Sequence, residues 1–248
     1  MEYFWYTKFT IPDGHGFALF GPQHLAWLAA AAAVCLVMGR LYSRWDERTR
    51  ARCRLAVGVL LLADELFKDV ASLATGQFRL DFLPFHLCSI NIFVVWADIL
   101  RPGPAKKEVL YAACLPGAVA ALLFPSWTKT PVWNFMALHS FTVHILLLLY
   151  PALLLAGGFR PRFANLRRAA APAALCVAGV FALNKLLGTN FMFLNGAGEG
   201  NPLTLFEQWL GDPGYLAAYP FLIALVWAVL YLPWALARRR AKEKTPAR

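Results

Sequence analysis

Seven apolar stretches separated by polar segments limit what this chain of 248 residues can fold into. A helix needs about 20 mostly apolar residues to cross the hydrocarbon core of a bilayer. The fourth stretch is short and contains Pro116 and Gly117, so it is predicted to be kinked or to stop short of a full crossing. We predict an all-α membrane protein with a single bundle of seven transmembrane helices. The stretches cover residues 17–38, 55–73, 82–100, 109–124, 132–155, 169–187 and 215–236.

The basic residues alternate between the connecting segments. Nineteen of the 24 Lys and Arg residues lie in segments 39–54, 101–108 and 156–168 and after residue 236. Cytoplasmic loops of membrane proteins are enriched in Lys and Arg. This alternation requires an odd number of crossings and predicts the N-terminus outside and the C-terminus in the cytoplasm. The other connecting segments hold only Lys8, Arg79 and Lys129.

The composition favours a membrane protein over a basic soluble domain. Hydrophobic residues make up 59% of the chain and charged residues 15%, against about 25% charged in soluble domains. Because the net charge of +10 follows the alternating loops, we expect no nucleic-acid partner. The five cysteines show no CxxC or zinc-type spacing, so we predict no structural disulfide, no metal and no cofactor.

The chain is predicted to have three parts. Residues 1–16 form an extracytoplasmic segment without the apolar core of a cleavable signal peptide. Residues 17–236 form the membrane domain, and residues 237–248 form a basic cytoplasmic tail. The longest outer loop, 188–214, is predicted to contain a short interfacial helix at 203–210. A loop of this length is more often functional than a plain connection.

Ionisable residues inside the second stretch indicate a polar interior. Asp64, Glu65, Lys68 and Asp69 fall within an arc of about 140° on a helix and form one polar stripe. Ionisable groups inside a bilayer are costly and usually face the bundle interior. Lys68 follows Glu65 by three residues and Asp64 by four, so it can neutralise part of their charge. The stripe either ties helices together or supports a functional site.

The third and fifth stretches carry a thiol, an amide and imidazoles. Cys88 and Asn91 lie about 60° apart on a helix, whereas His86 is about 160° from Cys88 and cannot pair with it there. His139 and His144 are about 140° apart, so we do not expect both to serve one site equally. Taken singly, a membrane cysteine is usually a packing residue and a buried histidine usually an interhelical donor.

Depth groups these residues into one set. At a rise of about 1.5 Å per residue, the polar residues named above fall between the bilayer centre and the outer surface. The inner halves of the helices hold mostly Leu, Ala and Val. We therefore predict a polar cavity in the outer half of the bilayer, covered by loop 188–214. The residues predicted to bind substrate or support this site are Asp64, Glu65, Lys68, Asp69, His86, Asn184, Lys185, Asn190 and Asn195.

A thiol, an imidazole and an amide are the groups needed for acyl transfer through a thioester. The Cys88 thiolate attacks an ester carbonyl, and a histidine takes the thiol proton and later returns one to a hydroxyl. Asn91 or a backbone N–H holds the oxyanion. In a helix over 82–100, Cys88 lies in the second turn, where the helix dipole has largely faded.

Several motifs resemble the YwaF-like bacterial membrane proteins, which are related to the animal transmembrane protein 164 family. HLCS and NFMFLNG are the more specific ones, and together the motifs span most of the chain. They are FGPQHL (20–25), LPFHLCSINIF (83–93), LPGAVAALLFP (115–125), HILLLLYP (144–151) and NFMFLNG (190–196), followed by NP (201–202).

The resemblance implies a function. The animal relatives are regarded as intramembrane phospholipid acyltransferases that use a cysteine and a histidine, akin to hydrolases of fatty-acid esters that use threonine and histidine. Carried over, the nucleophile is Cys88 and the base is His144, seven residues before Pro151, with His139 in reserve. On straight helices Cys88 and His144 differ in depth by roughly 9 Å, so a kink or a shifted boundary is expected. The implied partner is a membrane phospholipid or lysophospholipid in a bacterial inner membrane.

Two other interpretations stay open. The carboxylates of the second stretch and the histidines of the fifth fit a proton relay in a small-solute transporter or binding protein. A pair of histidines from facing helices fits haem ligation. The oligomeric state is not predicted from these patterns.

Overall fold

The computed structural model describes residues 2–198 and 202–243, with side chains up to residue 240. Met1, residues 199–201 of the predicted outer loop and residues 244–248 of the predicted tail lie outside the described residues. Within these ranges all regular secondary structure is helical. The prediction of an all-α protein is confirmed for the described residues.

Each predicted stretch contains a long helix. The fourth is one continuous helix made of α4 (Pro104–Val109), a π-helical turn (Leu110–Cys114) and α5 (Leu115–Leu123). The short helix α8 (Leu203–Leu210) lies where the interfacial helix was predicted. The other long helices are α1 (Pro22–Arg44), α2 (Glu47–Ala74), α3 (Leu87–Leu100), α6 (Phe135–Ala156), α7 (Phe163–Leu187) and α9 (Ala218–Glu243).

Five segments of the described chain are long and apolar enough to cross a membrane. α2 is not among them because it carries several ionisable residues, and the α4–α5 helix is divided by its π turn. The five segments are Pro22–Arg44, Leu80–Leu100, Phe135–Ala156, Phe163–Leu187 and Gly214–Arg240.

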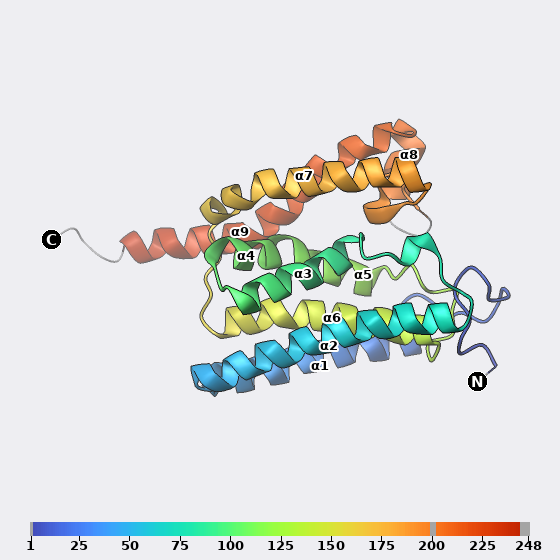
Figure 1. Cartoon of the computed structure of the whole chain (residues 1–248). Coiled ribbons are helices and arrows are strands. Elements are labelled where there is room, and N and C mark those ends of the chain that lie inside the picture. The colour runs from blue at the N-terminus through green and yellow to red at the C-terminus, as the bar shows by residue number, and fades with distance from the viewer. Residues whose placement is uncertain (1, 199–201, 244–248) are drawn as a thin grey trace.

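Helix α6 lies at the centre of the bundle, in contact with α1, α2 and α5. Figure 1 shows the long helices running along one common direction, with α1 and α2 on one side of α6 and with α7 and α9 beyond α3, α4 and α5. About half of α6 (56%) is buried, against 6% of segment Gly214–Arg240 at the periphery. The described N-terminal segment and the described end of α9 lie at opposite ends of the bundle (Figure 1). Side chains of α6 are therefore placed to meet groups from several other helices.

The predicted basic loop 39–54 is mostly helical, which corrects the sequence-based boundary. α1 continues to Arg44 and α2 begins at Glu47. Asp46 caps α2 by accepting the backbone N–H of Thr49 at 2.8 Å, a common arrangement at helix starts. Arg and Glu are good helix formers, so both helices extend past their apolar stretches.

Helix α3 starts five residues later than predicted for the stretch 82–100. Pro84 has no N–H and disfavours helical backbone at Leu83, whose φ and ψ are −58° and 148°. A single 3₁₀ turn, Leu80–Phe82, precedes this break, and His86 is the N-cap residue of α3. In Figure 1 the start of α3 is set back from the end of α2 toward the middle of the bundle. The first turn of α3 therefore lies inside the bundle.

The predicted irregularity of the fourth stretch takes the form of a π turn. The Leu115 N–H donates to the Leu110 carbonyl, five residues earlier. Pro116 follows directly and supplies no N–H, which a widened turn accommodates. Helix α4 contacts α7, whereas α5 contacts α6.

Two other boundaries differ from the prediction. α7 begins at Phe163, six residues before the predicted start, and α9 continues to Glu243. The described part of the predicted tail, residues 237–243, is thus helical. Ala, Arg, Lys and Glu have high helix propensity, so a helix can continue beyond the apolar stretch.

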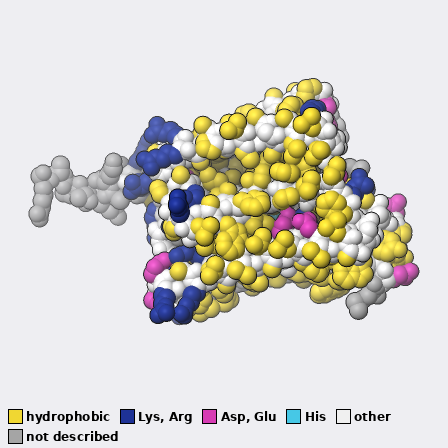
Figure 2. All heavy atoms as spheres, viewed as in Figure 1, with side chains coloured by type: hydrophobic (Ala, Val, Ile, Leu, Met, Phe, Trp, Pro, Cys, Tyr) yellow, Lys and Arg dark blue, Asp and Glu magenta, His cyan; other side chains and the backbone are white. Residues whose placement is uncertain are grey.

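The surface is that of a membrane protein. Figure 2 shows a broad band of hydrophobic side chains, with most Lys and Arg side chains gathered at the end from which the C-terminal helix emerges. Leu175, Leu186 and Val229 are 76%, 81% and 67% exposed. An extended apolar surface of this kind is stable against lipid rather than water. Acidic side chains interrupt the band near its middle (Figure 2).

Candidate functional site

Ionisable side chains gather in the second half of α2, as the polar stripe predicts. The Lys68 ammonium donates to Glu65 Oε1 and to the Phe82 carbonyl, both at 2.8 Å. It also forms an ion pair with Asp69 Oδ1 at 3.2 Å. Lys68 and Glu65 are both buried. A buried ion pair needs further hydrogen bonds to offset its desolvation, and the Phe82 carbonyl supplies one.

The polar contacts continue to α6 and α3. His139 Nδ1 lies 3.2 Å from Asp64 Oδ1, and His139 Nε2 lies 3.8 Å from Glu65 Oε2. The Thr142 hydroxyl donates to Asp64 Oδ2 at 2.7 Å, and the Ser89 hydroxyl donates to Glu65 Oε1 at 2.9 Å. These contacts join three helices. We call the set Asp64, Glu65, Lys68, Asp69, Ser89, His139 and Thr142 the α2–α3–α6 cluster.

Cys88 lies in the first turn of α3, not in the second turn as predicted, because the helix begins at Leu87. Its side chain is half-buried against an apolar core that includes Val143 and Leu147 of α6. Asn91, one turn further along, is buried and donates to the Leu87 carbonyl at 2.8 Å. No hydrogen bond joins Cys88 to a histidine in the part of the chain that the structure describes.

His86 lies outside the helix, so the helical spacing from Cys88 does not apply to it. The Met192 N–H donates to His86 Nδ1 at 3.4 Å. The imidazole also contacts the rings of Phe191 and Phe193, with centroids 5.2 and 6.4 Å away. His86 therefore connects the start of α3 to the outer loop.

His144 has a different environment from His139. Its Nδ1 donates to the Ser140 carbonyl at 2.6 Å, which leaves Nε2 as the acceptor nitrogen of a neutral imidazole. The indole of Trp127 stacks on the ring, with centroids 5.4 Å apart and planes 14° apart. Within the described residues Nε2 has no hydrogen-bond partner. The carboxylates of α2 thus contact His139 and not His144.

Asn184 holds the outer loop from the end of α7. Its amide donates to the Phe191 carbonyl at 2.9 Å and accepts the Phe191 N–H at 2.8 Å and the Thr189 hydroxyl at 3.0 Å. The side chain is fully buried. Asn184 therefore fixes the conformation of the loop.

Three other predicted supporting residues bind one another at the same loop, Lys185 from the end of α7 and Asn190 and Asn195 from within the loop. Lys185 donates to Asn195 Oδ1, and Asn190 Oδ1 accepts the Asn195 N–H at 2.9 Å. Phe191 and Leu194 of the loop lie in one apolar cluster with Leu83, Phe85 and Ile90. The described part of loop 188–214 therefore covers the segment that leads into α3.

Sequence reasoning missed two members of the α2–α3–α6 cluster. Thr142 follows His139 by three residues and shares its helix face, a signal that was available in the sequence. Ser89 directly follows Cys88, and nothing in its spacing indicates a partner on α2. Among the described residues no group of three or more His, Cys, Asp and Glu is placed to hold a metal ion.

The prediction of apolar inner halves is incomplete. Glu108 of α4 is fully buried and accepts hydrogen bonds from the Tyr231 hydroxyl at 2.8 Å, the Arg162 N–H at 2.9 Å and the Asn165 amide at 3.3 Å. These contacts attach α7 and α9 to α4. Glu108 directly follows two lysines in the sequence, and the predicted basic segment 101–108 therefore included it.

The helices, the apolar surface and the buried ionisable cluster define an integral membrane protein with a polar interior. The model of the TMEM164 family matches residues 19–231. The chain belongs to the TMEM164 family, which confirms the relation inferred from the motifs. Comparisons with curated proteins and with solved structures gave no match.

Proposed function

We propose that this protein is an intramembrane acyltransferase or lipid-ester hydrolase in which Cys88 is the nucleophile and His144 the base. The substrate is a membrane phospholipid or lysophospholipid. The observation that carries the proposal is the half-buried thiol of Cys88 in the first turn of a helix that begins inside the bundle.

The proposal includes seven membrane crossings in the inner membrane of a bacterium of the YwaF-like branch. The N-terminus lies outside and the C-terminus in the cytoplasm. Support comes from the N-terminal segment and the described end of α9, which lie at opposite ends of the bundle, and from the basic side chains at the end where α9 emerges (Figures 1 and 2). In this orientation Cys88 and the α2–α3–α6 cluster lie toward the outer leaflet.

The N–H groups at the start of α3 favour negative charge near Cys88, in opposition to the burial of the thiol and the nearby Glu65 carboxylate. The first N–H groups of a helix have no intrahelical partners and carry the positive end of its dipole. They can stabilise the thiolate and afterwards the oxyanion of a tetrahedral intermediate. Asn91 assists with an amide that has two hydrogens, one of which is bonded to the Leu87 carbonyl.

The hydrogen bond of His144 favours it over His139 as the base. Because Nδ1 of His144 donates to the Ser140 carbonyl, the lone pair of the neutral ring is at Nε2. Both ring nitrogens of His139 face carboxylate oxygens of Asp64 and Glu65. His139 therefore belongs to the α2–α3–α6 cluster and is the reserve for the catalytic role.

The reaction proceeds in two balanced steps. His144 accepts the Cys88 proton, the thiolate adds to the ester carbonyl, and the carbon–oxygen bond of the ester breaks. The leaving alkoxide takes the proton from His144, which yields a lysolipid and an acyl thioester. In the second step His144 deprotonates a lysolipid hydroxyl or water, which attacks the thioester. The carbon–sulfur bond breaks, and the Cys88 thiolate takes the proton back from His144. Acyl tails remain in the hydrocarbon throughout.

The test is capture of the acyl group on the full chain in liposomes. Mass spectrometry after incubation with phospholipid is expected to detect a hydroxylamine-labile acyl group on Cys88. Cys88→Ser removes the thioester, whereas Cys176→Ser, a half-buried cysteine of α7, is the matched control and retains it. Undiminished activity in both Cys88→Ala and His144→Ala would refute the proposal.

A proton-coupled transporter or small-solute binding protein is the second candidate. It is favoured by the continuous chain of contacts from Lys68 through Glu65 and His139 to Asp64. Such chains of ionisable groups form proton relays in membrane proteins. Solute uptake by proteoliposomes that is lost in Asp64→Asn and unchanged in Cys88→Ala would select this function over acyl transfer.

A further inference from the structure

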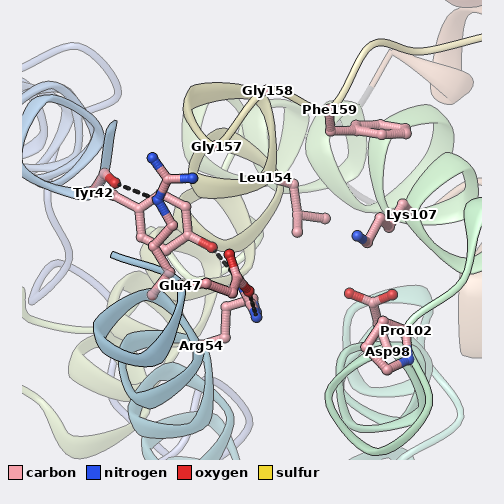
Figure 3. Close-up of a pocket in the computed structure, with 11 residues that line it drawn as sticks. Tyr42, Glu47, Arg54, Asp98, Pro102, Lys107, Leu154, Gly157, Gly158 and Phe159 are labelled. Carbon is pink, nitrogen blue, oxygen red and sulfur yellow. Dashed lines mark hydrogen bonds and ion pairs between the residues drawn. The ribbon is translucent and has the colours of Figure 1, made fainter. Parts of the chain in front are cut away.

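A cavity of about 320 Å³ lies at the end of the bundle away from Cys88. It is formed where the α1–α2 turn, the end of α3, the start of α4 and the end of α6 meet. Figure 3 shows Tyr42, Arg54, Asp98 and Lys107 around it. Asp98 follows Cys88 by ten residues on α3, roughly 15 Å along a helix axis. The cavity is therefore separate from the site proposed above.

Three cations line this cavity. Arg54 donates to the Tyr42 hydroxyl and pairs with Glu47 at 2.7 Å, and Arg50 donates to the Tyr42 carbonyl at 2.9 Å. The Lys107 ammonium has no hydrogen-bond or ion-pair partner among the described side chains and backbone groups. In Figure 3 its ammonium points into the cavity. The cavity thus offers one uncommitted cation beside two arginines that are already held in place.

A buried carboxylate faces Lys107. Asp98 is 1% exposed and accepts the Tyr150 hydroxyl at 3.2 Å and the Gly103 N–H at 3.3 Å. It forms no ion pair with a Lys or Arg of the described chain. Figure 3 shows the Asp98 carboxylate and the Lys107 ammonium on facing sides of the cavity. Both signs of charge therefore point into one space without neutralising each other.

We propose that this cavity binds a phosphoethanolamine group, with the phosphate held by Lys107 and Arg54 and the ammonium held by Asp98. Lys and Arg are the usual ligands of phosphate, and an ammonium group has three N–H donors for a carboxylate. The Glu47 side chain that now pairs with Arg54 is 72% exposed, and such surface ion pairs are weak, so a phosphate can displace it.

The size and place of the cavity fit a lipid headgroup. Its volume is at the lower end of the roughly 300–1,000 Å³ typical of small-ligand sites. It opens at the end of the bundle where the basic side chains gather, which is the level of headgroups in one leaflet (Figure 2). A phosphatidylethanolamine from that leaflet and a soluble phosphoethanolamine present the same group to it.

The experiment measures lipid binding to the detergent-solubilised full chain by native mass spectrometry. The probes are phosphatidylethanolamine, phosphatidylcholine and phosphatidylglycerol with identical acyl chains, and soluble O-phosphoethanolamine. Phosphatidylethanolamine is expected to bind roughly tenfold or more tightly than the other two lipids. Choline has no N–H for Asp98, and phosphatidylglycerol has no ammonium at all. Saturable binding of O-phosphoethanolamine would identify the soluble source, and its failure to bind would identify the lipid.

The variants distinguish lipid binding in the cavity from general attraction of lipid to basic residues. Lys107→Met is expected to weaken phosphatidylethanolamine binding roughly tenfold. Lys106→Met removes the same charge from the neighbouring residue, which does not line the cavity, and is expected to bind as the unmodified chain does. Asp98→Asn is expected to reduce the preference over phosphatidylcholine. Equal losses in Lys106→Met and Lys107→Met, or equal affinity for the three lipids, would overturn the proposal. Cys88→Ala is expected to leave lipid binding intact, so this test is independent of the proposed catalysis.

Discussion

His139 Nδ1 lies 3.2 Å from Asp64 Oδ1, and this contact joins the central helix α6 to α2. The pair is extended by Thr142, whose hydroxyl donates to the second oxygen of Asp64 at 2.7 Å. Both oxygens of one carboxylate are thus engaged by α6. A carboxylate held in this way fixes the axial register of the two helices, together with the contact of 3.8 Å between His139 Nε2 and Glu65 Oε2.

Replacing Thr142 with Val tests this contact. The shape is nearly unchanged, but Asp64 Oδ2 loses its donor, so we expect a destabilisation of roughly 1–3 kcal/mol. Reversible unfolding in mixed detergent measures the change. Thr75→Val is the control, because the Thr75 hydroxyl bonds only to backbone carbonyls at the end of α2. Equal effects at both positions would show that Asp64 does not depend on Thr142.

The ion pair between Lys68 and Glu65 is expected to behave as a unit. Lys68→Met leaves two carboxylates without their cation and should destabilise the fold by roughly 3–5 kcal/mol. Adding Glu65→Gln to that variant removes one of the uncompensated charges, so the double variant should lose less than the sum of the single changes. A double-mutant cycle of unfolding free energies measures this difference. Strict additivity would contradict the pairing.

Glu108 should be more important for stability than its place beside a basic loop indicates. Glu108→Gln replaces one acceptor oxygen with an amide that faces donors, so we expect a loss of roughly 1.5–3 kcal/mol and weaker attachment of α7 and α9. Glu47→Gln is the control, since that side chain is 72% exposed and pairs only at the surface. Thermal unfolding and protease susceptibility of segment 157–163 would report the difference. Identical melting of the two variants would contradict the structural role of Glu108.

Asn184 is expected to control the order of the outer loop. Asn184→Ala removes three hydrogen bonds to Thr189 and Phe191, so proteolysis within residues 188–198 should become several-fold faster. Leu186→Ala, two residues along and 81% exposed, serves as the comparison and should leave cleavage unchanged. If proposed catalysis depends on the loop, acylation of Cys88 should fall in Asn184→Ala alone. Unaltered cleavage in Asn184→Ala would refute this role.

The start of α2 should depend on pH through Asp46. The Thr49 backbone N–H lowers the pKa of the Asp46 carboxyl below its usual value. A group with a lowered pKa in the folded state stabilises the fold above its unfolded pKa, roughly 3.9, and this stabilisation disappears as the pH falls through the folded pKa. The difference in melting temperature between the natural chain and Asp46→Asn should therefore change below about pH 4. A constant difference down to pH 2 would contradict the lowered pKa of Asp46.

Hydropathy and charge were sufficient to predict the helical class and the approximate place of each long helix. They failed at boundaries where local chemistry overrides the apolar pattern. Pro84 delays α3, and the Asp46 cap starts α2 far ahead of its apolar stretch. These differences changed the interpretation of Cys88, which moved from the second turn to the first.

The candidate site was only partly predictable for a related reason. The stripe from Asp64 to Asp69 follows from helical periodicity alone. The partners of the stripe on other helices depend on how the helices pack. Sequence spacing therefore could not show that Asp64 contacts His139 and not His144. Depth alone grouped Asn184, Lys185, Asn190 and Asn195 with the cavity, whereas their side chains hold the outer loop, the first two from the end of α7 and the other two from within the loop.

The π turn at Leu110–Cys114 limits how this protein can vary in length. The extra residue in that turn offsets all later side chains by about 100° relative to an uninterrupted α-helix. Glu108 can therefore meet α7 and α9, while Leu122 shares an apolar cluster with Phe141 of α6. Deleting one residue there would turn Leu122 away from α6 even with every contact residue retained. Substitutions by residues of similar size do not change the angular positions of the later side chains. We therefore expect this segment to tolerate such substitutions but not insertions or deletions.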